Sequence, residues 1–91
     1  MPEARAHLFI DGVVQGVGYR YFAMHKAAAL SIRGFAKNLS DGRVEVVAEG
    51  ERGLVEEFMK ELRRGPMSAH VTDVRVEWED PTFEFEGFRG L

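Results

Sequence analysis

Residues 15–20, Gln-Gly-Val-Gly-Tyr-Arg, combine residue types and a spacing that suit anion binding. The two glycines let a loop turn its backbone N–H groups inward, because glycine has no Cβ to block unusual φ values or close approach. A helical pattern follows directly, and a helix N-terminus adds unpaired N–H donors and the positive end of its dipole. Arg20 adds a planar fork of donors. The stretch therefore predicts a site for a phosphate or carboxylate group.

The spacing alone leaves a plainer interpretation open. The stretch is not a dinucleotide fingerprint, because the third glycine would fall at Tyr21, and it is not a P-loop, because no Gly-Lys-Ser/Thr follows. A tight strand-to-helix turn with a solvated arginine would give the same residues. Against that, the positive charge of Arg20 near the positive end of a helix dipole is locally unfavourable, and a bound anion would relieve the conflict.

The elements that must position this loop follow from the periodicity of apolar residues. Alternation predicts strands and helical spacing predicts helices. Asp41-Gly42 suits a hairpin turn, Gly50 ends the strand that follows it, and Gly65-Pro66 stops the second helix. The expected elements, in order, are a strand at about 5–13, a helix at about 20–30, strands at about 33–39 and 43–49, a helix at about 51–64, a strand at about 71–78 and a short last strand that holds Phe83 and Phe85.

This order predicts one α+β domain over residues 1–91. A βαββαβ order with two helices on one face of an antiparallel sheet is the split βαβ, or ferredoxin-like, two-layer sandwich, here with a short extra C-terminal strand. The glycines of residues 86–91 indicate a mobile or loosely packed end.

Composition and charge limit the possible partners. The net charge is −3, and the strand at 43–49 has no aromatic side chain on which bases could stack, so we expect no nucleic-acid binding. We expect no membrane span and no signal peptide, and hence a cytoplasmic protein. The sequence has no cysteine, and its three histidines are not at metal-ligand spacing, so we expect no metal.

Three blocks of the sequence resemble the acylphosphatase family. Residues 12–20, Gly-Val-Val-Gln-Gly-Val-Gly-Tyr-Arg, closely resemble its signature Gly-x-Val-Gln-Gly-Val-Gly-Phe/Tyr-Arg. Residues 34–38, Gly-Phe-Ala-Lys-Asn, followed by Gly-Arg-Val at 42–44, resemble its second block, and residues 65–71 its third, Gly-Pro-x-x-Ala-x-Val. The blocks fall in the family's order and span most of the chain.

The resemblance implies an enzyme that hydrolyses the carboxyl–phosphate bond of small acyl phosphates to a carboxylate and inorganic phosphate. It implies that Arg20 and Asn38 are catalytic, and it implies neither a cofactor nor a metal. Asn38 would hold the attacking water, whereas from the residues alone a strand-end asparagine that satisfies a turn is the commoner case. The substrate-binding residues that it implies are Gln15, Gly16, Val17, Gly18, Tyr19 and Arg20.

Two departures from the family pattern and one rival function remain. Tyr19 stands where phenylalanine is commonest, and Ala36 replaces the usual valine near Asn38, which could loosen the placement of Asn38. The rival is a non-catalytic module that binds a phosphate-bearing ligand or partner through the same loop. Acylphosphatase-like domains also occur at the start of larger carbamoyl-transfer maturation proteins. Such a binder needs Arg20 but has no evident use for Asn38, so we favour an enzyme. Because the chain ends where the domain ends, we expect the enzyme to be free-standing, and we expect a monomer.

Overall fold

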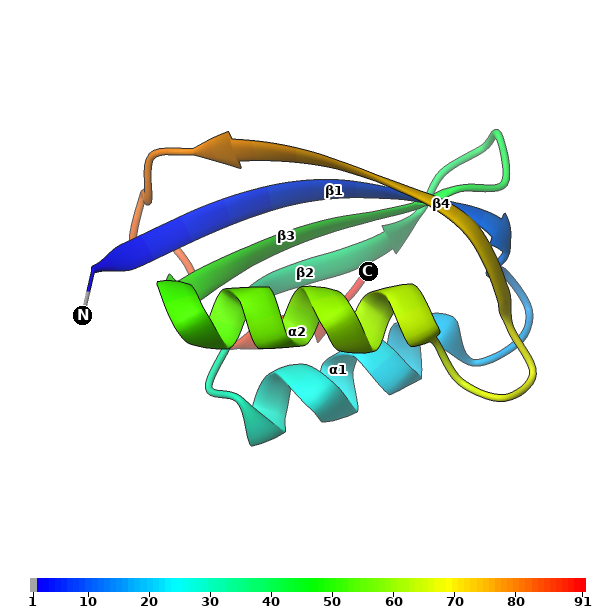
Figure 1. Ribbon diagram of the computed structural model, residues 1–91, viewed down its shortest axis with the longest axis horizontal. Helices are drawn as coiled ribbons and strands as arrows, with labels where there is room; N and C mark the ends of the chain where they lie inside the picture. Colours follow the sequence, from blue (N-terminus) through cyan, green and yellow to red (C-terminus); the bar gives the residue numbers. More distant parts are fainter. Residues whose placement is uncertain (1) are drawn as a thin grey trace.

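A computed structural model describes residues 2–91. Both helices lie on the same side of one sheet (Figure 1). The βαββαβ order with a short extra strand is confirmed. The elements are β1 (Glu3–Val13), α1 (Tyr19–Ala29), β2 (Arg33–Asn38), β3 (Val44–Glu51), α2 (Arg52–Arg64), β4 (His70–Glu79) and β5 (Phe88–Gly90).

The sheet has the strand order β4-β1-β3-β2-β5. The pairs β1–β4, β1–β3 and β2–β3 are antiparallel, but β5 runs parallel to β2. The expectation of a wholly antiparallel sheet is therefore wrong at its last strand. The chain leaves β4 at one edge of the sheet and must cross to the opposite edge before β5 forms, so β5 enters beside β2 in the same direction.

The core lies between the sheet and the two helices. Alternation along β1 turns Leu8 and Ile10 toward the helices, as the period of two predicts, and both are fully buried. The carboxylate of Glu51 caps α2 by accepting hydrogen bonds from the N–H groups of Gly53 and Leu54 at 3.0 and 3.3 Å. The apolar stripe that α2 buries consists of Val55, Phe58 and Leu62.

Two predicted boundaries are wrong, and each has a packing reason. β3 runs through Gly50 to Glu51. An added Cβ at Gly50 would lie 3.1 Å from a methyl group of Ile32, so glycine is needed here for close packing within the strand and not to end it. Phe83 and Phe85 form no strand. The ring of Phe85 instead packs edge-on against Phe35, at 6.1 Å between centroids, on the face of the sheet away from the helices.

A buried carboxylate fastens the segment that crosses this open face. Glu49 is fully buried and lies on β3. Its Oε2 accepts hydrogen bonds from Arg5 at 2.8 Å and from the Thr82 hydroxyl at 3.1 Å, and its Oε1 accepts one from the N–H of Phe83 at 3.0 Å. Residues 82–83 are thereby held over the sheet, so that the chain can continue into β5.

The end of the chain packs more firmly than its glycines indicated. Phe88 joins the core, with its ring 5.5 Å from that of Phe58. The N–H of Leu91 donates to the carbonyl of Ala36 at 2.9 Å. The expectation of a loosely packed end is wrong for residues 88–91, because pairing with β2 supplies partners that the local sequence does not reveal.

Candidate functional site

The glycine-rich loop joins β1 to α1 and takes the conformation that its glycines permit. Gly16 and Gly18 have φ values of 74° and 77°, in the left-handed region that side chains disfavour. Space around both is open, so the conformation rather than crowding calls for glycine. Gly18 begins α1 without a side-chain cap, and the first turn carries no acidic residue. The first N–H groups of α1 therefore remain available to an anion.

Side chains on both sides fix this loop in place. The amide of Gln15 donates to the carbonyls of Leu39 and Arg43, at 2.7 and 2.9 Å, and so ties the loop to the β2–β3 hairpin. The hydroxyl of Ser68 donates to the carbonyl of Val17 at 2.9 Å, and so ties it to the turn after α2. The three sequence blocks thus meet at one place, the loop itself.

Arg20 projects from the first turn of α1 into a cavity of about 320 Å³. Its guanidinium donates a hydrogen bond through Nη1 to the carbonyl oxygen of Leu91. This bond orients one end of the fork and leaves the other donors of Arg20 without a partner among residues 2–91. β5 therefore helps to position Arg20, because it brings Leu91 to the site.

Asn38 lies at the end of β2 and lines the same cavity as Arg20. Its Oδ1 is buried and has no hydrogen-bond partner among the described residues. A buried acceptor without a partner costs on the order of 1–3 kcal/mol, so it calls for a partner that is not part of the chain. A water molecule held in the cavity would satisfy it.

The cavity brings together most of the predicted site residues. Gly16, Gly18, Tyr19, Arg20 and Asn38 line it, whereas Gln15 and Val17 do not. Helical spacing could have found Met24, which follows Arg20 by one turn. No local signal could have found Gly90, which the pairing of β5 with β2 brings to the site. The sequence analysis missed four of the lining residues: Val14, Tyr21, Met24 and Gly90.

The sequence profile of one family, described as Acylphosphatase, matches residues 6–90. The chain belongs to the acylphosphatase family. An acylphosphatase of Trichormus variabilis is 49% identical over 87 residues, which cover 96% of this chain and 82% of that protein. The crystal structure of the Bacillus subtilis acylphosphatase superposes with a TM-score of 0.93 at 33% identity, covering 97% of this chain and 98% of that one.

A larger protein contains a similar domain. The crystal structure of full-length HypF, in its phosphate- and nucleotide-bound form, matches with a TM-score of 0.90 at 25% identity, and the match covers 99% of this chain but 12% of that one. No helix within residues 2–91 is both long enough and apolar enough to cross a bilayer.

Tyr19, which departs from the commonest residue of the acylphosphatase signature, has a structural role. Its hydroxyl is buried and donates to the carbonyl of Leu62 at 2.6 Å. In an ideal helix that carbonyl would accept from the residue four positions on, but Pro66 has no N–H. Burial raises the pKa of the Tyr19 hydroxyl well above its ordinary value, so it stays protonated and serves as this donor.

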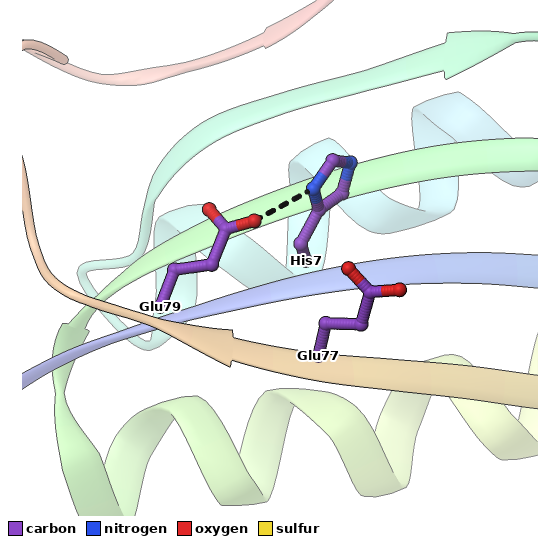
Figure 2. A group of neighbouring side chains, drawn as sticks. All are labelled: His7, Glu77 and Glu79. Carbon is purple, nitrogen blue, oxygen red and sulfur yellow. Dashed lines mark hydrogen bonds and ion pairs between the residues drawn. The ribbon is translucent and has the colours of Figure 1, made fainter.

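A second group of titratable side chains lies away from the acylphosphatase signature. Figure 2 shows His7 of β1 beside Glu77 and Glu79 of β4, with one dashed contact between His7 and Glu79. Nδ1 of His7 lies 3.1 Å from Glu79, and Nε2 lies 2.6 Å from Glu45 of β3. Burial alone would lower the pKa of His7, but the bonds to Glu45 and Glu79 outweigh it and raise that pKa.

The His7 group is explained by its own ion pairs. The ligand atoms of His7, Glu77 and Glu79 lie within 4.8 Å of one another, near enough for a metal ion, but both ring nitrogens of His7 already have carboxylate partners, Glu45 and Glu79. The spacing of the histidines did not indicate this group, because the strand register that brings Glu77 opposite His7 is not visible in the sequence.

Proposed function

We propose that Arg20 and Asn38 carry the acylphosphatase activity of this chain, which splits an acyl phosphate into a carboxylate and inorganic phosphate. The observation that carries this proposal is the buried, unpartnered Oδ1 of Asn38 in the cavity that Arg20 lines. An anion-binding loop alone has no use for such an acceptor. A site that must hold both an anion and a water molecule does.

The loop would bind the phosphoryl group. Its oxygens would accept hydrogen bonds from backbone N–H groups between Gly16 and the first turn of α1, and from the free donors of Arg20. Phosphoryl transfer passes through a loose transition state in which charge spreads over the three equatorial oxygens. Fixed donors aimed at these oxygens stabilise that charge without reorganising during the reaction.

Asn38 would hold the attacking water in line with the leaving carboxylate. The water oxygen forms a bond to phosphorus, and the bond from phosphorus to the carboxyl oxygen breaks. The carboxylate leaves with the bonding electrons. One proton of the water stays on its oxygen, and the other passes to a phosphoryl oxygen. The described residues that line the cavity include no carboxylate and no histidine, which suits a reaction that relies on positioning and charge stabilisation.

The test compares the native chain with Arg20→Ala and Asn38→Ala in the hydrolysis of acetyl phosphate. We expect Arg20→Ala to lose at least about a hundredfold in kcat/KM, as is typical when a donor to a developing oxyanion is removed. We expect a loss of about a hundredfold for Asn38→Ala as well, because the attacking water is then no longer held in place. Arg20→Ala should also weaken inhibition by inorganic phosphate, whereas Asn38→Ala should leave it nearly unchanged. Arg20→Lys is a matched control that keeps the charge but loses the fork, and we expect it to recover only part of the activity.

One outcome of this test would show that the chain binds phosphate without hydrolysing acyl phosphates. If the folded native chain does not exceed the background rate, yet binds phosphate in a way that Arg20→Ala abolishes, the chain is a phosphate-binding module and not an enzyme. Circular dichroism of each variant separates a lost site from a lost fold.

We infer further that the enzyme works as a monomer in the cytoplasm and binds no nucleic acid. The net charge of −3 supports the last point, because nucleic-acid binding needs basic surface. Gel filtration coupled to light scattering tests the monomer, and an electrophoretic shift assay with single-stranded RNA at low salt tests nucleic-acid binding. A dimer mass or a shifted RNA band would overturn the respective inference.

A further inference from the structure

The candidate site consists of two halves that lie on different elements. The backbone N–H groups from Gly16 to the first turn of α1, together with Arg20, form the half that would bind the phosphoryl group. Asn38, the last residue of β2, forms the half that would hold the attacking water. An error on the order of 1 Å in the placement of reacting groups can lower a rate by about a hundredfold. A contact that fixes one half relative to the other therefore affects the rate.

The side chain of Gln15 connects these two halves. Gln15 directly precedes Gly16, where the phosphate half begins. Its Nε2 donates one hydrogen bond to the carbonyl of Leu39 at 2.7 Å and another to that of Arg43 at 2.9 Å. Leu39 directly follows Asn38, which belongs to the last pair of the β2–β3 ladder. Gln15 thus holds the hairpin just beyond the point at which the pairing of the strands ends.

Both carbonyls that accept from Gln15 also take part in closing the hairpin. The carbonyl of Arg43 accepts from the N–H of Leu39 at 2.8 Å, and the carbonyl of Leu39 accepts from the N–H of Gly42 at 3.2 Å. A carbonyl oxygen has two lone pairs, so each can accept both of its bonds. Because one planar amide contacts both sides of the hairpin, it fixes the tilt of the hairpin relative to the loop as well as its distance from it.

The amide of Gln15 is not placed to contact a phosphate. A primary amide carries two N–H bonds, and those of Gln15 are directed at the two hairpin carbonyls. Its remaining polar atom is an oxygen, which would repel an anion. Gln15 is also not among the residues that line the cavity between Arg20 and Asn38. Its side chain can therefore act on the reaction by positioning other groups.

A separate link positions Arg20. The N–H of Leu91 donates to the carbonyl of Ala36 on β2, and the carbonyl of Leu91 accepts from the guanidinium of Arg20. This link runs through the end of the chain to a side chain on α1. Gln15 instead ties the backbone of the loop to the hairpin next to Asn38. The two links therefore constrain different parts of the site.

We propose that Gln15 is a positioning residue, whose two hydrogen bonds set the distance and the angle between the water held by Asn38 and the phosphoryl group in the loop. This proposal rests on the function proposed for Arg20 and Asn38. Without the bonds of Gln15 the loop would still bind phosphate, because its backbone donors and Arg20 remain and Ser68 still holds Val17. The chemical step would slow, because the water would less often lie in line with the breaking bond.

The first test compares the native chain with Gln15→Met, whose side chain has a similar length but no donor. Acetyl phosphate is the substrate, and kcat, KM and the inhibition constant of inorganic phosphate are measured. We expect Gln15→Met to lower kcat by about tenfold or more, and to change KM and the inhibition constant by less than about threefold. Gln15→Asn keeps the amide on a shorter side chain and should lose less in kcat. Circular dichroism checks the fold, and Gln15→Asn carries the comparison if Gln15→Met does not fold.

The same change in the Asn38→Ala background separates positioning from a general loosening of the site. If Gln15 acts through Asn38, a chain without Asn38 has no water-holding group left to position. We therefore expect Gln15→Met to lower the residual kcat of Asn38→Ala by less than about twofold.

Asp41→Ala is the matched control for Gln15→Met. The carboxylate of Asp41 accepts hydrogen bonds from the backbone N–H and the guanidinium of Arg43, at 3.1 and 2.8 Å, within the same hairpin. The variant therefore removes contacts of the hairpin but keeps its bonds to the loop. Because Asp41 is exposed and lies outside the cavity, we expect kcat to stay within about twofold of native.

The outcomes separate the role of Gln15 from the function on which it rests. If the native chain does not hydrolyse acetyl phosphate above background, the function proposed for Arg20 and Asn38 is wrong. If it does, the positioning role is wrong when Gln15→Met keeps the native kcat, or when it weakens phosphate inhibition as much as it lowers kcat. An equal loss of kcat with and without Asn38, or an equal loss in Asp41→Ala, would also overturn it.

Discussion

Tyr19 supplies a hydrogen bond that Pro66 denies to the end of α2. Removing the hydroxyl in Tyr19→Phe leaves the buried carbonyl of Leu62 without that donor. We expect the free energy of unfolding to fall by about 1–2 kcal/mol, the usual cost of a buried polar group without a partner. Urea denaturation measures it. Tyr21→Phe removes an exposed hydroxyl and should change the stability by less than about 0.5 kcal/mol. Equal stability of both variants would mean that water reaches the carbonyl of Leu62.

At the candidate site the sequence predicts the loop and the two polar side chains, but not their surroundings. The positions of Arg20 and the glycines can be predicted from residues 15–20 alone, because the loop and the first turn of α1 are adjacent in sequence. The unpartnered Oδ1 of Asn38 and the contact between Arg20 and Leu91 depend on three segments meeting. No spacing within any one segment encodes that meeting.

Glu49 holds residues 82–83 in place over the face of the sheet that lies away from the helices. Glu49→Gln keeps the size of the side chain but removes the charge that Arg5 and the N–H of Phe83 contact. We expect a loss of about 2–4 kcal/mol in the free energy of unfolding, because Arg5 then lacks its buried partner. Looser attachment of β5 should also lower kcat/KM, since Leu91 orients Arg20.

A second variant from the same network is the control for Glu49→Gln. Glu84 also accepts a hydrogen bond from Arg5, at 3.2 Å, but it is exposed. Glu84→Gln should change the stability by less than about 1 kcal/mol, as for a surface ion pair. If both variants lower the free energy of unfolding equally, the burial of Glu49 is not what holds residues 82–83 to the sheet. Thermal denaturation followed by circular dichroism compares them.

Periodicity predicted every element that packs through its own repeating pattern. β1 and α2 bury regular stripes, so their approximate bounds follow from the sequence alone. β3 is instead buried on both faces over residues 46–50. β5 has three residues, too few for a pattern, and it exists because β2 offers an unpaired edge. The alternation of Phe83 and Phe85 resembles a strand, but the buried carboxylate of Glu49 and the ring of Phe35 account for their placement.

The stability of the whole sheet should depend on pH through His7, which bridges β3 and β4 from β1. Its pKa is raised above the ordinary value of 6.5, so its contribution is complete below pH 6.5 and is lost as the pH rises through the raised pKa. Bonds from Arg5 and His7 lower the pKa of Glu79 below 4.5, so its contribution is present above pH 4.5 and is lost in more acidic solution. The contributions of His7 and Glu79 to stability are therefore both present between pH 4.5 and pH 6.5.

The variant His7→Gln measures this dependence. We expect it to cost about 1 kcal/mol in the free energy of unfolding at pH 5.5 and less at pH 8.5, because the charge of His7 is lost as the pH rises through its raised pKa. Urea denaturation at the two pH values gives the difference. A cost that is the same at both values would show that the ring acts through packing against Phe9, whose ring lies 4.8 Å away, and not through its charge.

The position of β1 in the sheet also affects how the protein folds during its synthesis. β1 is made before β4, yet the two strands pair, with contacts as distant in sequence as that between Arg5 and Glu79. Sheets built on pairings so distant in sequence form slowly. A ribosome must therefore have released β4 before β1 finds both of its neighbours. Until then its apolar face has no stable cover, and in the cell chaperones are the natural candidates to shield it.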